Sequence, residues 1–404
     1  MKNTAGFASS SHQPIPANPE DHLMPIAQIT SDAFADGKFV QEIADQYIGN
    51  CHYDFNTTRL IFDGDELIHH WGVWGYPMRL ESATLKVAGI GAVVTREPYR
   101  ERGLMAMAAN DSFKAMVANG YDLSVLRGRH YVKFGYTRAW NYITYRLKAE
   151  EIPAYDLSQP YKILEPVHLS EINSVYNQSH SKYTGTAIRP TYRNPSSETI
   201  STFRGWFDDN RKLTGYVRAL PSEDKKTLQC FEAAGDPRQG LAVLAKLFTE
   251  DGYETLTFFT MPRQHPILKI LRRGACIIED RYFHNTGWRV KLINLKSTLG
   301  KILPLLEARL QKSHLLNWKG ELHLDGGEHQ ANLKVESGRI KILDAAPSSH
   351  NLQAGASLAR FLIGSDDPKE IIQQEGVVCR GDADELIEVI FPNLHPMLSH
   401  FDEY

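Results

Sequence analysis

The spacing of hydrophobic and polar residues in the first third of the chain predicts strands alternating with helices. One helix is predicted to begin at Pro19, and a second, amphipathic helix to run from Gly103 to Asn119. The predicted apolar face of the second helix comprises Leu104, Met107, Ala108, Ala115 and Ala118, with Asp111 interrupting it. Strand-like runs cover residues 59–63, 69–76, 83–95, 123–126 and 142–147. This order is typical of an α/β or α+β domain that ends near residue 150.

A second segment follows a proline-containing linker over residues 149–160 and shows a similar order. Its predicted strands cover residues 214–220, 227–233, 255–260 and 288–293, and a helix covers residues 240–250. This strand–turn–helix–strand order suggests an internal duplication whose second copy has lost a cofactor site. The turn Asp236-Pro-Arg-Gln-Gly240 offers a single arginine, and we interpret it as structural.

The pattern changes again beyond Lys296. A helix is predicted over residues 298–311, a meander of short strands over 320–324, 330–335 and 338–342, and helices over 358–363 and 383–390. Residues 391–404 are predicted to be irregular but contain apolar side chains, and a tail of this kind usually docks onto another part of a protein. We therefore predict a flexible tail over residues 1–17 and domains over 18–150, 151–295 and 296–404.

Composition narrows the classes of function. Of the 404 residues, 42% are hydrophobic and 23% charged, and the net charge of −3 gives no support to a nucleic-acid binder. The four cysteines lack CxxC spacing, which indicates neither a zinc site nor a disulfide framework. His69 and His70 alternate along a predicted strand and so would not share a metal ion. No apolar run approaches the roughly 20 residues of a membrane span, and no signal peptide is recognisable, so we expect a cytoplasmic protein.

The segment from Val93 to Met105 carries the clearest chemical signal. An apolar strand ends at Thr95, a basic turn follows, and Gly103 opens a helix. A helix N-terminus has unpaired N–H groups and partial positive charge, so it can hold a pyrophosphate, to which Arg100 and Arg102 add charge-assisted bonds. The predicted cofactor-binding residues are Val93, Val94, Thr95, Arg100, Glu101, Arg102, Gly103, Leu104 and Met105. The strand edge can pair with an extended arm such as pantetheine. The alternative is a basic turn before an ordinary amphipathic helix.

The sequence Arg100-Glu-Arg-Gly103-Leu-Met105 resembles the motif of the GNAT acetyltransferase superfamily. That motif has Arg or Gln, two residues, Gly, one residue, and then Gly or Ala. Met105 departs from the pattern at the last position, where Ala106 beside it can ease the crowding. The resemblance implies acetyl-CoA as a co-substrate, with its pyrophosphate at this turn.

Further elements resemble the enhanced intracellular survival (Eis) family of acetyltransferases. They are Leu126-Arg-Gly-Arg-His-Tyr-Val-Lys-Phe-Gly-Tyr136, Leu358-Ala-Arg-Phe-Leu-Ile-Gly364 and the ending Phe401-Asp-Glu-Tyr404. The resemblance implies two GNAT-type domains, of which only the first binds acetyl-CoA, followed by a domain similar to sterol carrier proteins. It also implies assembly as a hexamer.

The same resemblance implies two catalytic groups. Tyr131 matches the tyrosine that serves as general acid and protonates the departing coenzyme A thiolate. The carboxylate of Tyr404 matches the group that deprotonates the attacking amine, and Asp402 and Glu403 would strengthen its attraction for a cation. The alternatives are that Tyr131 packs as a loop aromatic, as Tyr136 is expected to do, and that the acidic end is frayed. His130 is the nearest rival acid.

The expected function is therefore N-acetyl transfer from acetyl-CoA to a primary amine by direct attack in a ternary complex. The resemblance points to aminoglycoside-like polyamines or lysine side chains as acceptors, and no metal or nucleic acid is expected to take part. The alternative is an acyl-CoA- or lipid-binding module that uses the C-terminal domain without acetyl transfer.

Overall fold

The computed structural model describes residues 12–404, which form two compact units. The first contains the described residues up to Gly75, together with Ala88–Gly120 and Tyr404, and the second contains Tyr76–Val87 and Tyr121–Glu403. The predicted flexible tail lies outside the described residues over positions 1–11. Ile15–Pro16, by contrast, form strand β1, with Ile15 opposite Leu60 in an antiparallel pair. Regular structure therefore begins before Asn18, because this short strand pairs with a neighbour that is distant in sequence.

In the first unit, the strands β1 to β4 are neighbours in chain order. Their bounds after β1 are Arg59–Asp63 for β2, Glu66–Leu80 for β3 and Ala83–Thr95 for β4, the last two continuing into the second unit. The helices are α1 (Pro19–Phe34), α2 (Val40–Glu42), the π-helix η1 (Ile43–Ile48), the 3-10 helix η2 (Glu97–Tyr99) and α3 (Leu104–Ala118). Helix α1 begins where predicted, since the side chain of Asn18 accepts a hydrogen bond from the N–H of Glu20 at 2.8 Å.

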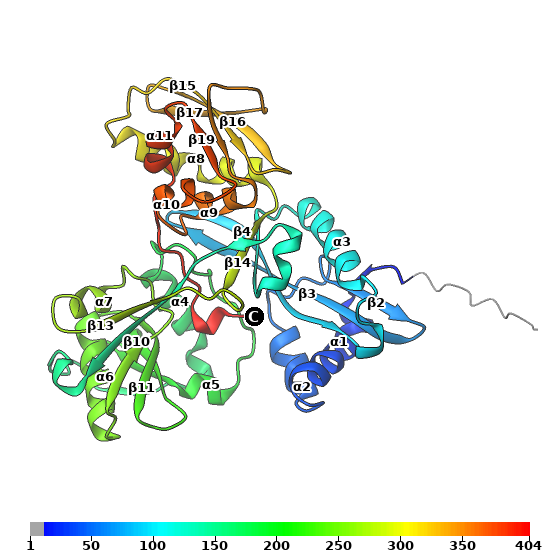
Figure 1. Ribbon diagram of the computed structural model, residues 1–404. Helices are drawn as coiled ribbons and strands as arrows, with labels where there is room; N and C mark the ends of the chain where they lie inside the picture. Colours follow the sequence, from blue (N-terminus) through cyan, green and yellow to red (C-terminus); the bar gives the residue numbers. More distant parts are fainter. Residues whose placement is uncertain (1–11) are drawn as a thin grey trace, which may run out of the picture. The chain divides into compact units, whose positions relative to one another are not determined.

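Helix α3 packs against β2 (Figure 1). Its bounds agree with the prediction, but its buried face differs in part. The buried residues are Leu104, Ala108, Ala109, Ser112 and Met116. Met107, predicted to be buried, is 36% exposed. Polar contacts hold this orientation, because Arg59 of β2 donates to Asp111 and the Ser112 hydroxyl donates to the Thr57 carbonyl at 2.7 Å.

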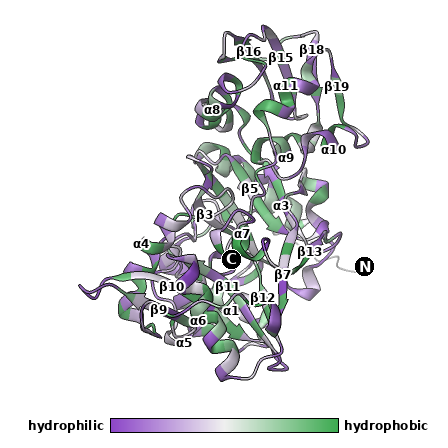
Figure 2. Cartoon of the chain, turned by 90° about the vertical axis from the view of Figure 1, so that its left-hand side faces the viewer, coloured by the Kyte–Doolittle hydropathy of each residue, from purple (hydrophilic) through white to green (hydrophobic). Residues whose placement is uncertain are grey.

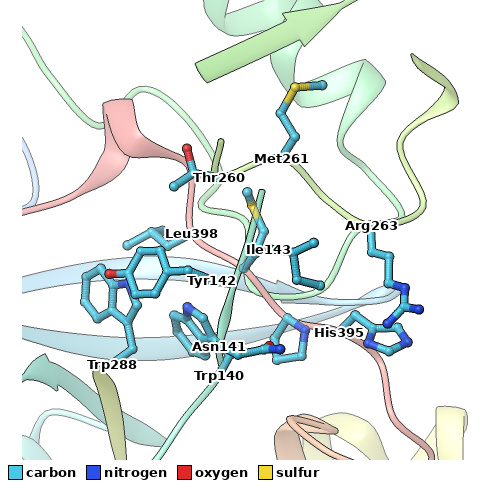
Figure 3. Close-up of a pocket in the computed structure, with 12 residues that line it drawn as sticks. Trp140, Asn141, Tyr142, Ile143, Thr260, Met261, Arg263, Trp288, His395 and Leu398 are labelled. Atoms are coloured by element: carbon cyan, nitrogen blue, oxygen red, sulfur yellow. The ribbon is translucent and has the colours of Figure 1, made fainter. Parts of the chain in front are cut away.

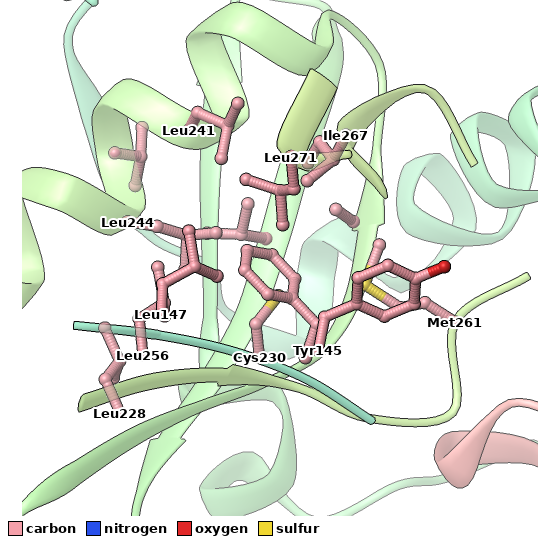
Figure 4. Close-up of a cluster of buried hydrophobic side chains, with 14 of the residues drawn as sticks. Tyr145, Leu147, Leu228, Cys230, Leu241, Leu244, Leu256, Met261, Ile267 and Leu271 are labelled. Carbon is pink, nitrogen blue, oxygen red and sulfur yellow. The ribbon is translucent and has the colours of Figure 1, made fainter. Parts of the chain in front are cut away.

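The second unit contains a sheet with the strand order β13-β7-β12-β11-β10-β9-β8, in which β11 and β12 are parallel. The bounds are Tyr142–Lys148 (β7), Tyr161–Ile163 (β8), Phe203–Phe207 (β9), Leu213–Pro221 (β10), Thr227–Ala234 (β11), Thr255–Phe258 (β12) and Ile277–Arg281 (β13). Helix α6 (Pro237–Glu250) packs on β10 and β11 (Figure 1). Leu241 and Leu244 of α6 join Leu147, Cys230 and Leu256 of the strands in one buried cluster (Figure 4).

Two predicted strands pair differently from what their order along the chain suggested. Strand β7, expected to complete the first domain, pairs antiparallel with β12 and β13. Conversely, β14 (Trp288–Leu292) pairs with β5 (Leu123–Arg127) and β6 (Thr137–Arg138). Local hydrophobic pattern predicts that a strand exists but not its partner, since pairing depends on long-range register. The domain bounds given above remain a prediction.

A third sheet in the second unit has the order β17-β16-β15-β18-β19. Its strands are β15 (Gly320–Asp325), β16 (Gln330–Glu336), β17 (Arg339–Leu343), β18 (His350–Gln353) and β19 (Val378–Arg380). The predicted meander is confirmed, whereas β18 and β19 were not predicted. The surrounding helices are α8 (Leu295–Gln311), α9 (Leu358–Ile363), α10 (Pro368–Ile372) and α11 (Ala383–Ile390).

The other helices of the second unit are α4 (Leu169–Ser179), α5 (Ser197–Ser201) and α7 (Pro266–Leu271). Hydrophobic residues are spread along the strands and helices, and many of the connecting loops are hydrophilic (Figure 2). The α+β class predicted from the sequence is confirmed. Among the residues described, no helix has both the length and the apolar character that crossing a membrane requires.

Candidate active site

The turn after β4 has an unusual backbone. Beyond η2, Glu101 adopts a φ of 62° and Gly103 a φ of 79°, both in the left-handed region. A side chain is disfavoured there, so glycine suits position 103, and the left-handed Glu101 marks local strain. A Cβ on Gly103 would meet no atom within 4 Å, which leaves this side of the backbone open to a ligand.

The turn presents hydrogen-bond donors. Helix α3 has no side-chain cap at its N-terminus, and within residues 12–404 the N–H groups of residues 101–105 donate to no protein acceptor. The Arg100 side chain is exposed and donates through Nε to the Thr95 carbonyl at 3.3 Å. The guanidinium of Arg102 lies 5.1 Å from the centre of the Tyr99 ring. Free amides and two arginines on one turn match the needs of a pyrophosphate.

The predicted cofactor-binding residues are not equally accessible. Val94 and Leu104 are 9% and 4% exposed, so their side chains belong to the core. Val93 and Met105 are half-buried, and the hydroxyl of Thr95 lies 2.7 Å from Nδ1 of His69. The exposed members, Glu101 to Gly103 and Arg100, form the part of the segment that a phosphate can reach.

Strand β4 is irregular just before the turn. Ala92 has a φ of 45°, and its carbonyl accepts a hydrogen bond from Nδ1 of the buried His70 at 2.7 Å. The other ring nitrogen of His70 accepts from the Tyr53 hydroxyl at 2.8 Å. Burial lowers the pKa of His70 to about 4, so the imidazole is neutral near pH 7 and serves as a donor to the strand. No local sequence pattern indicated this role.

Tyr404 belongs to the first unit, where it contacts β3 and β4. Its ring stacks on Trp74 with centroids 6.2 Å apart and an interplanar angle of 13°. A Cβ on Gly89 would lie 2.3 Å from the Tyr404 ring, and one on Gly91 would lie 2.9 Å from the Tyr47 hydroxyl. Only glycine permits these approaches. Sequence reasoning did not assign this role, although glycine inside a strand is a known sign of close contact.

The residues before Tyr404 are anchored within the second unit by a buried ionic network. Arg189 donates to Asp402 through Nε at 2.9 Å and to Glu232 through Nη1 at 2.8 Å, and the Arg189 and Asp402 side chains are 0% exposed. Although burial alone favours the neutral acid, the Arg189 guanidinium lowers the pKa of Glu232 to about 2. Arg189 also lies 3.4 Å from the Tyr176 ring centre.

This network bears on one expectation. The buried Asp402 binds Arg189, which it shares with Glu232, and Glu403 pairs with Arg127 at 2.5 Å, so both carboxylates are engaged within the protein. Their contacts hold the tail within the second unit. The docking of the tail agrees with the prediction from its apolar residues, since Phe401 is 6% exposed.

Tyr131 belongs to the second unit and lies on the 3-10 helix η3 (Arg129–Phe134). It is half-buried, and its ring meets Tyr136 at 6.4 Å in an edge-on arrangement. Burial raises the pKa of Tyr131, which keeps the phenol protonated near pH 7. Tyr136 is 1% exposed, with its hydroxyl 2.6 Å from that of Ser124, and is a packing residue as predicted, whereas His130 is exposed.

The residues described contain no group of three or more His, Cys, Asp or Glu side chains that could hold a metal ion. His69 and His70 instead contact Thr95 and Ala92 of β4.

Comparisons with known proteins agree with the geometry of the turn. Residues 16–139, which include β4, the turn and α3, match a family model described as an acetyltransferase (GNAT) domain. The chain contains a GNAT acetyltransferase domain. Such a domain implies an acyl-CoA-dependent N-acetyltransferase, which uses acyl-CoA and an amine. A search of curated proteins found no match.

Solved structures share the fold over nearly the whole chain. A GCN5-related N-acetyltransferase from Anabaena variabilis is 16% identical, with a TM-score of 0.73 over 96% of this chain and 98% of that one. A probable N-acyltransferase from Enterococcus faecalis is 14% identical, with a TM-score of 0.73 over 97% and 99%. Eis1 from Mycobacterium abscessus is 14% identical, with a TM-score of 0.61 over 84% and 90%. At these identities, the similarity establishes the fold alone.

Proposed function

We propose that the protein transfers an acetyl group from acetyl-CoA to a primary amine by direct attack in a ternary complex. The observation that carries the proposal is the turn from Arg100 to Met105, with its free amides and left-handed Gly103. The pyrophosphate would accept hydrogen bonds from these amides and from Arg100 and Arg102. The pantetheine arm would run along β4, beside the irregular Ala92.

In this proposal, the main-chain carboxylate of Tyr404, the last residue of the sequence, accepts a proton from the attacking ammonium group. The free amine then attacks the thioester carbonyl carbon, the C–S bond breaks, and the nitrogen loses a second proton as the amide forms. That proton returns to the Tyr131 oxygen, which has given its own to the departing thiolate. The stacking of Tyr404 on Trp74 and its approach to Gly89 of β4 support this assignment. The ionic network around Arg189 fixes the residues that lead to it.

Tyr131 is proposed as the general acid that protonates the departing coenzyme A thiolate. Tyr131 is half-buried and its phenol is protonated near pH 7, as a general acid must be before the transfer. His130 is the competing acid, but its exposure to solvent does not favour it over Tyr131.

We also propose that the protein belongs to the Eis family of acetyltransferases. It is supported by the Leu126–Tyr136 and Phe401–Tyr404 motifs and by the fold similarity to Eis1. It carries with it a second, degenerate GNAT-like domain over 151–295, a sterol-carrier-like domain over 296–404, a hexameric assembly, and polyamines or lysine side chains as acceptors.

The test is release of free thiol from acetyl-CoA in the presence of a panel of amines that includes aminoglycosides, linear polyamines and a lysine peptide. We expect turnover with at least one polyamine. Binding of coenzyme A without turnover on any amine would overturn the proposal and favour a binding module instead.

Variants assign the two catalytic groups. Appending one glycine after Tyr404 displaces the carboxylate and is expected to lower kcat roughly a hundredfold, whereas Tyr404→Phe keeps the ring stacking and the carboxylate and serves as its control. Tyr131→Phe is expected to lower kcat by a similar factor, with His130→Ala as its control. Unchanged kcat in Tyr131→Phe, or a loss confined to His130→Ala, would reassign the acid.

A further inference from the structure

The second unit contains a basic cavity whose lining includes neither of the proposed catalytic groups, Tyr131 and Tyr404. Its volume is about 550 Å³, and its lining includes Arg129, His130, Arg138, Tyr282, Phe283 and Arg289. Another cavity is much smaller, with a volume of about 30 Å³, the space of one water (Figure 3). It is bordered by Trp140, Tyr142 and Trp288 on one side and by Arg263 and His395 on the other. The basic cavity falls in the size range of small-molecule sites.

Backbone hydrogen bonds hold the walls of the cavity together. The N–H of Arg129, at the start of η3, donates to the Asn285 carbonyl at 2.9 Å, and that of Gly128 donates to Gly287 at 3.3 Å. The guanidinium of Arg289, from β14, donates to the His284 carbonyl at 2.8 Å. The loop that carries the aromatic residues is therefore tied to η3 and to β14.

The lining has an excess of positive charge. It contains three arginines, two histidines and no carboxylate. Arg138 contacts Asp366 at 3.0 Å, but Asp366 also binds Arg360 at 2.7 Å, so one carboxylate is shared between two guanidinium groups. The buried Nε of Arg289 has no partner within the described chain. This surplus would repel a cationic amine and favours an anionic ligand.

The cavity also has aromatic faces. Tyr282 and Phe283 are 52% and 41% exposed, and Arg138 lies 4.6 Å from the centre of the Tyr282 ring. Exposed aromatic side chains beside guanidinium groups can stack on a planar ring while the arginines bind a phosphate. We propose that this cavity binds the phosphorylated end of an adenine-nucleotide-like ligand, with the phosphate at Arg129 and Arg289 and the ring against Tyr282 or Phe283.

The phosphate and ring can come from two sources, a free nucleotide or the 3′-phosphoadenosine end of coenzyme A. Calorimetric titration with AMP, adenosine and inorganic phosphate tests the site. The titration uses the Arg100→Ala/Arg102→Ala protein, so that the turn before α3 does not contribute. We expect AMP to bind more tightly than adenosine or phosphate. Arg129→Ala/Arg289→Ala, added to that protein, is expected to weaken AMP binding roughly tenfold to hundredfold.

Matched variants keep the result interpretable. Arg211→Ala/Arg273→Ala removes the same charge from exposed positions outside the cavity and should leave AMP binding unchanged. Because Arg289 also supports the loop, Arg129→Ala/His130→Ala provides a second variant that changes only exposed side chains. The proposal would be overturned if AMP binds and neither cavity variant weakens its binding. It would also be overturned if AMP does not bind and the protein has equal affinity for coenzyme A and 3′-dephospho-coenzyme A.

A second measurement identifies the source of the bound phosphate and ring. It compares the affinities for coenzyme A and 3′-dephospho-coenzyme A in protein with an intact Arg100–Met105 turn. If Arg129→Ala/Arg289→Ala abolishes a preference for coenzyme A, the cavity binds its 3′-phosphate. If AMP binding is lost while the ratio is unchanged, the ligand is a free nucleotide. Both results come from binding measurements and do not depend on turnover. A failure of the acetyl-transfer proposal can therefore be distinguished from a failure of the cavity proposal.

Discussion

The protein contains two strand–turn–helix segments whose turns differ in chemistry. In the segment formed by β4 and α3, the helix begins at a left-handed glycine with no side-chain cap. In the segment formed by β11 and α6, Asp236 caps the helix by accepting from the N–H of Arg238 at 2.8 Å, and Pro237 contributes no N–H. The first turn leaves its amide N–H groups available. In the second turn, the Asp236 carboxylate accepts from one amide N–H and adds a negative charge. A phosphate fits only the first.

The strands before the two turns share one feature. His70 donates to the Ala92 carbonyl of β4 at 2.7 Å, and His265 donates to the Ala233 carbonyl of β11 at 3.0 Å. Burial lowers the pKa of each histidine to about 4. The two strands are thus supported in a similar way, and the two segments differ at the turn.

The largest expected effect comes from removing the arginines of the first turn. Arg100→Ala/Arg102→Ala should raise the KM for acetyl-CoA roughly tenfold to hundredfold per arginine, since each charge-assisted bond contributes about 1.5–3 kcal/mol. Arg238→Ala, in the second turn, is the matched control and should leave the KM unchanged. Steady-state kinetics with varied acetyl-CoA measures both. An equal rise in both variants would mean that the turns do not differ in function.

The α+β class and the strand–turn–helix segment could be predicted from the sequence, whereas contacts between distant residues could not. Arg100, Gly103 and the strand ending at Thr95 lie close together in the sequence, so their spacing predicts a phosphate turn. The partners of Tyr404 and Asp402 are distant in sequence, and no local pattern connects Arg189 to Asp402 or Gly89 to Tyr404. The pairing of β7 and β14 was missed for the same reason, because register between distant strands has no local signature.

Acidification tests the shared support of the two strands. A histidine with a lowered folded pKa binds its proton mainly in the unfolded state, so its contribution to stability is complete above the unfolded pKa. As pH falls from 6.5 toward about 4, we expect the free energy of unfolding to decrease by roughly 1.4 kcal/mol per pH unit for each histidine. Urea unfolding between pH 7 and pH 4.5 provides the measurement.

Two variants isolate these contributions. His70→Asn and His265→Gln each place an amide N–H near the position of the donating ring nitrogen, and neither titrates. Each should make the pH dependence shallower by about one proton. Slopes identical to that of the unmodified protein would show that these histidines do not remain neutral in the folded state.

A smaller effect is expected from Gly103→Ala. The left-handed φ of 79° costs a residue with a Cβ roughly 1–2 kcal/mol, and the added methyl group faces the open side of the turn. We expect weaker acetyl-CoA binding and a small loss of stability. Gly240→Ala is the control, because Gly240 lies inside α6, where a Cβ would be 3.2 Å from Cδ1 of Ile267. An acetyl-CoA affinity that falls only in Gly240→Ala would contradict the assignment of the first turn.

The smallest effect concerns the cap of the second turn. Asp236→Ala should destabilise the protein by about 1 kcal/mol, because the N–H of Arg238 loses its acceptor, while the KM for acetyl-CoA stays the same. Asp236→Asn retains the side-chain acceptor without the charge, so it should restore most of the stability, as urea unfolding would measure. If Asp236→Ala instead created a second coenzyme A site, the Asp236 cap alone would be what prevents a phosphate from binding at this turn. We expect no such gain, because the second turn has a single arginine and Pro237 still withholds an amide.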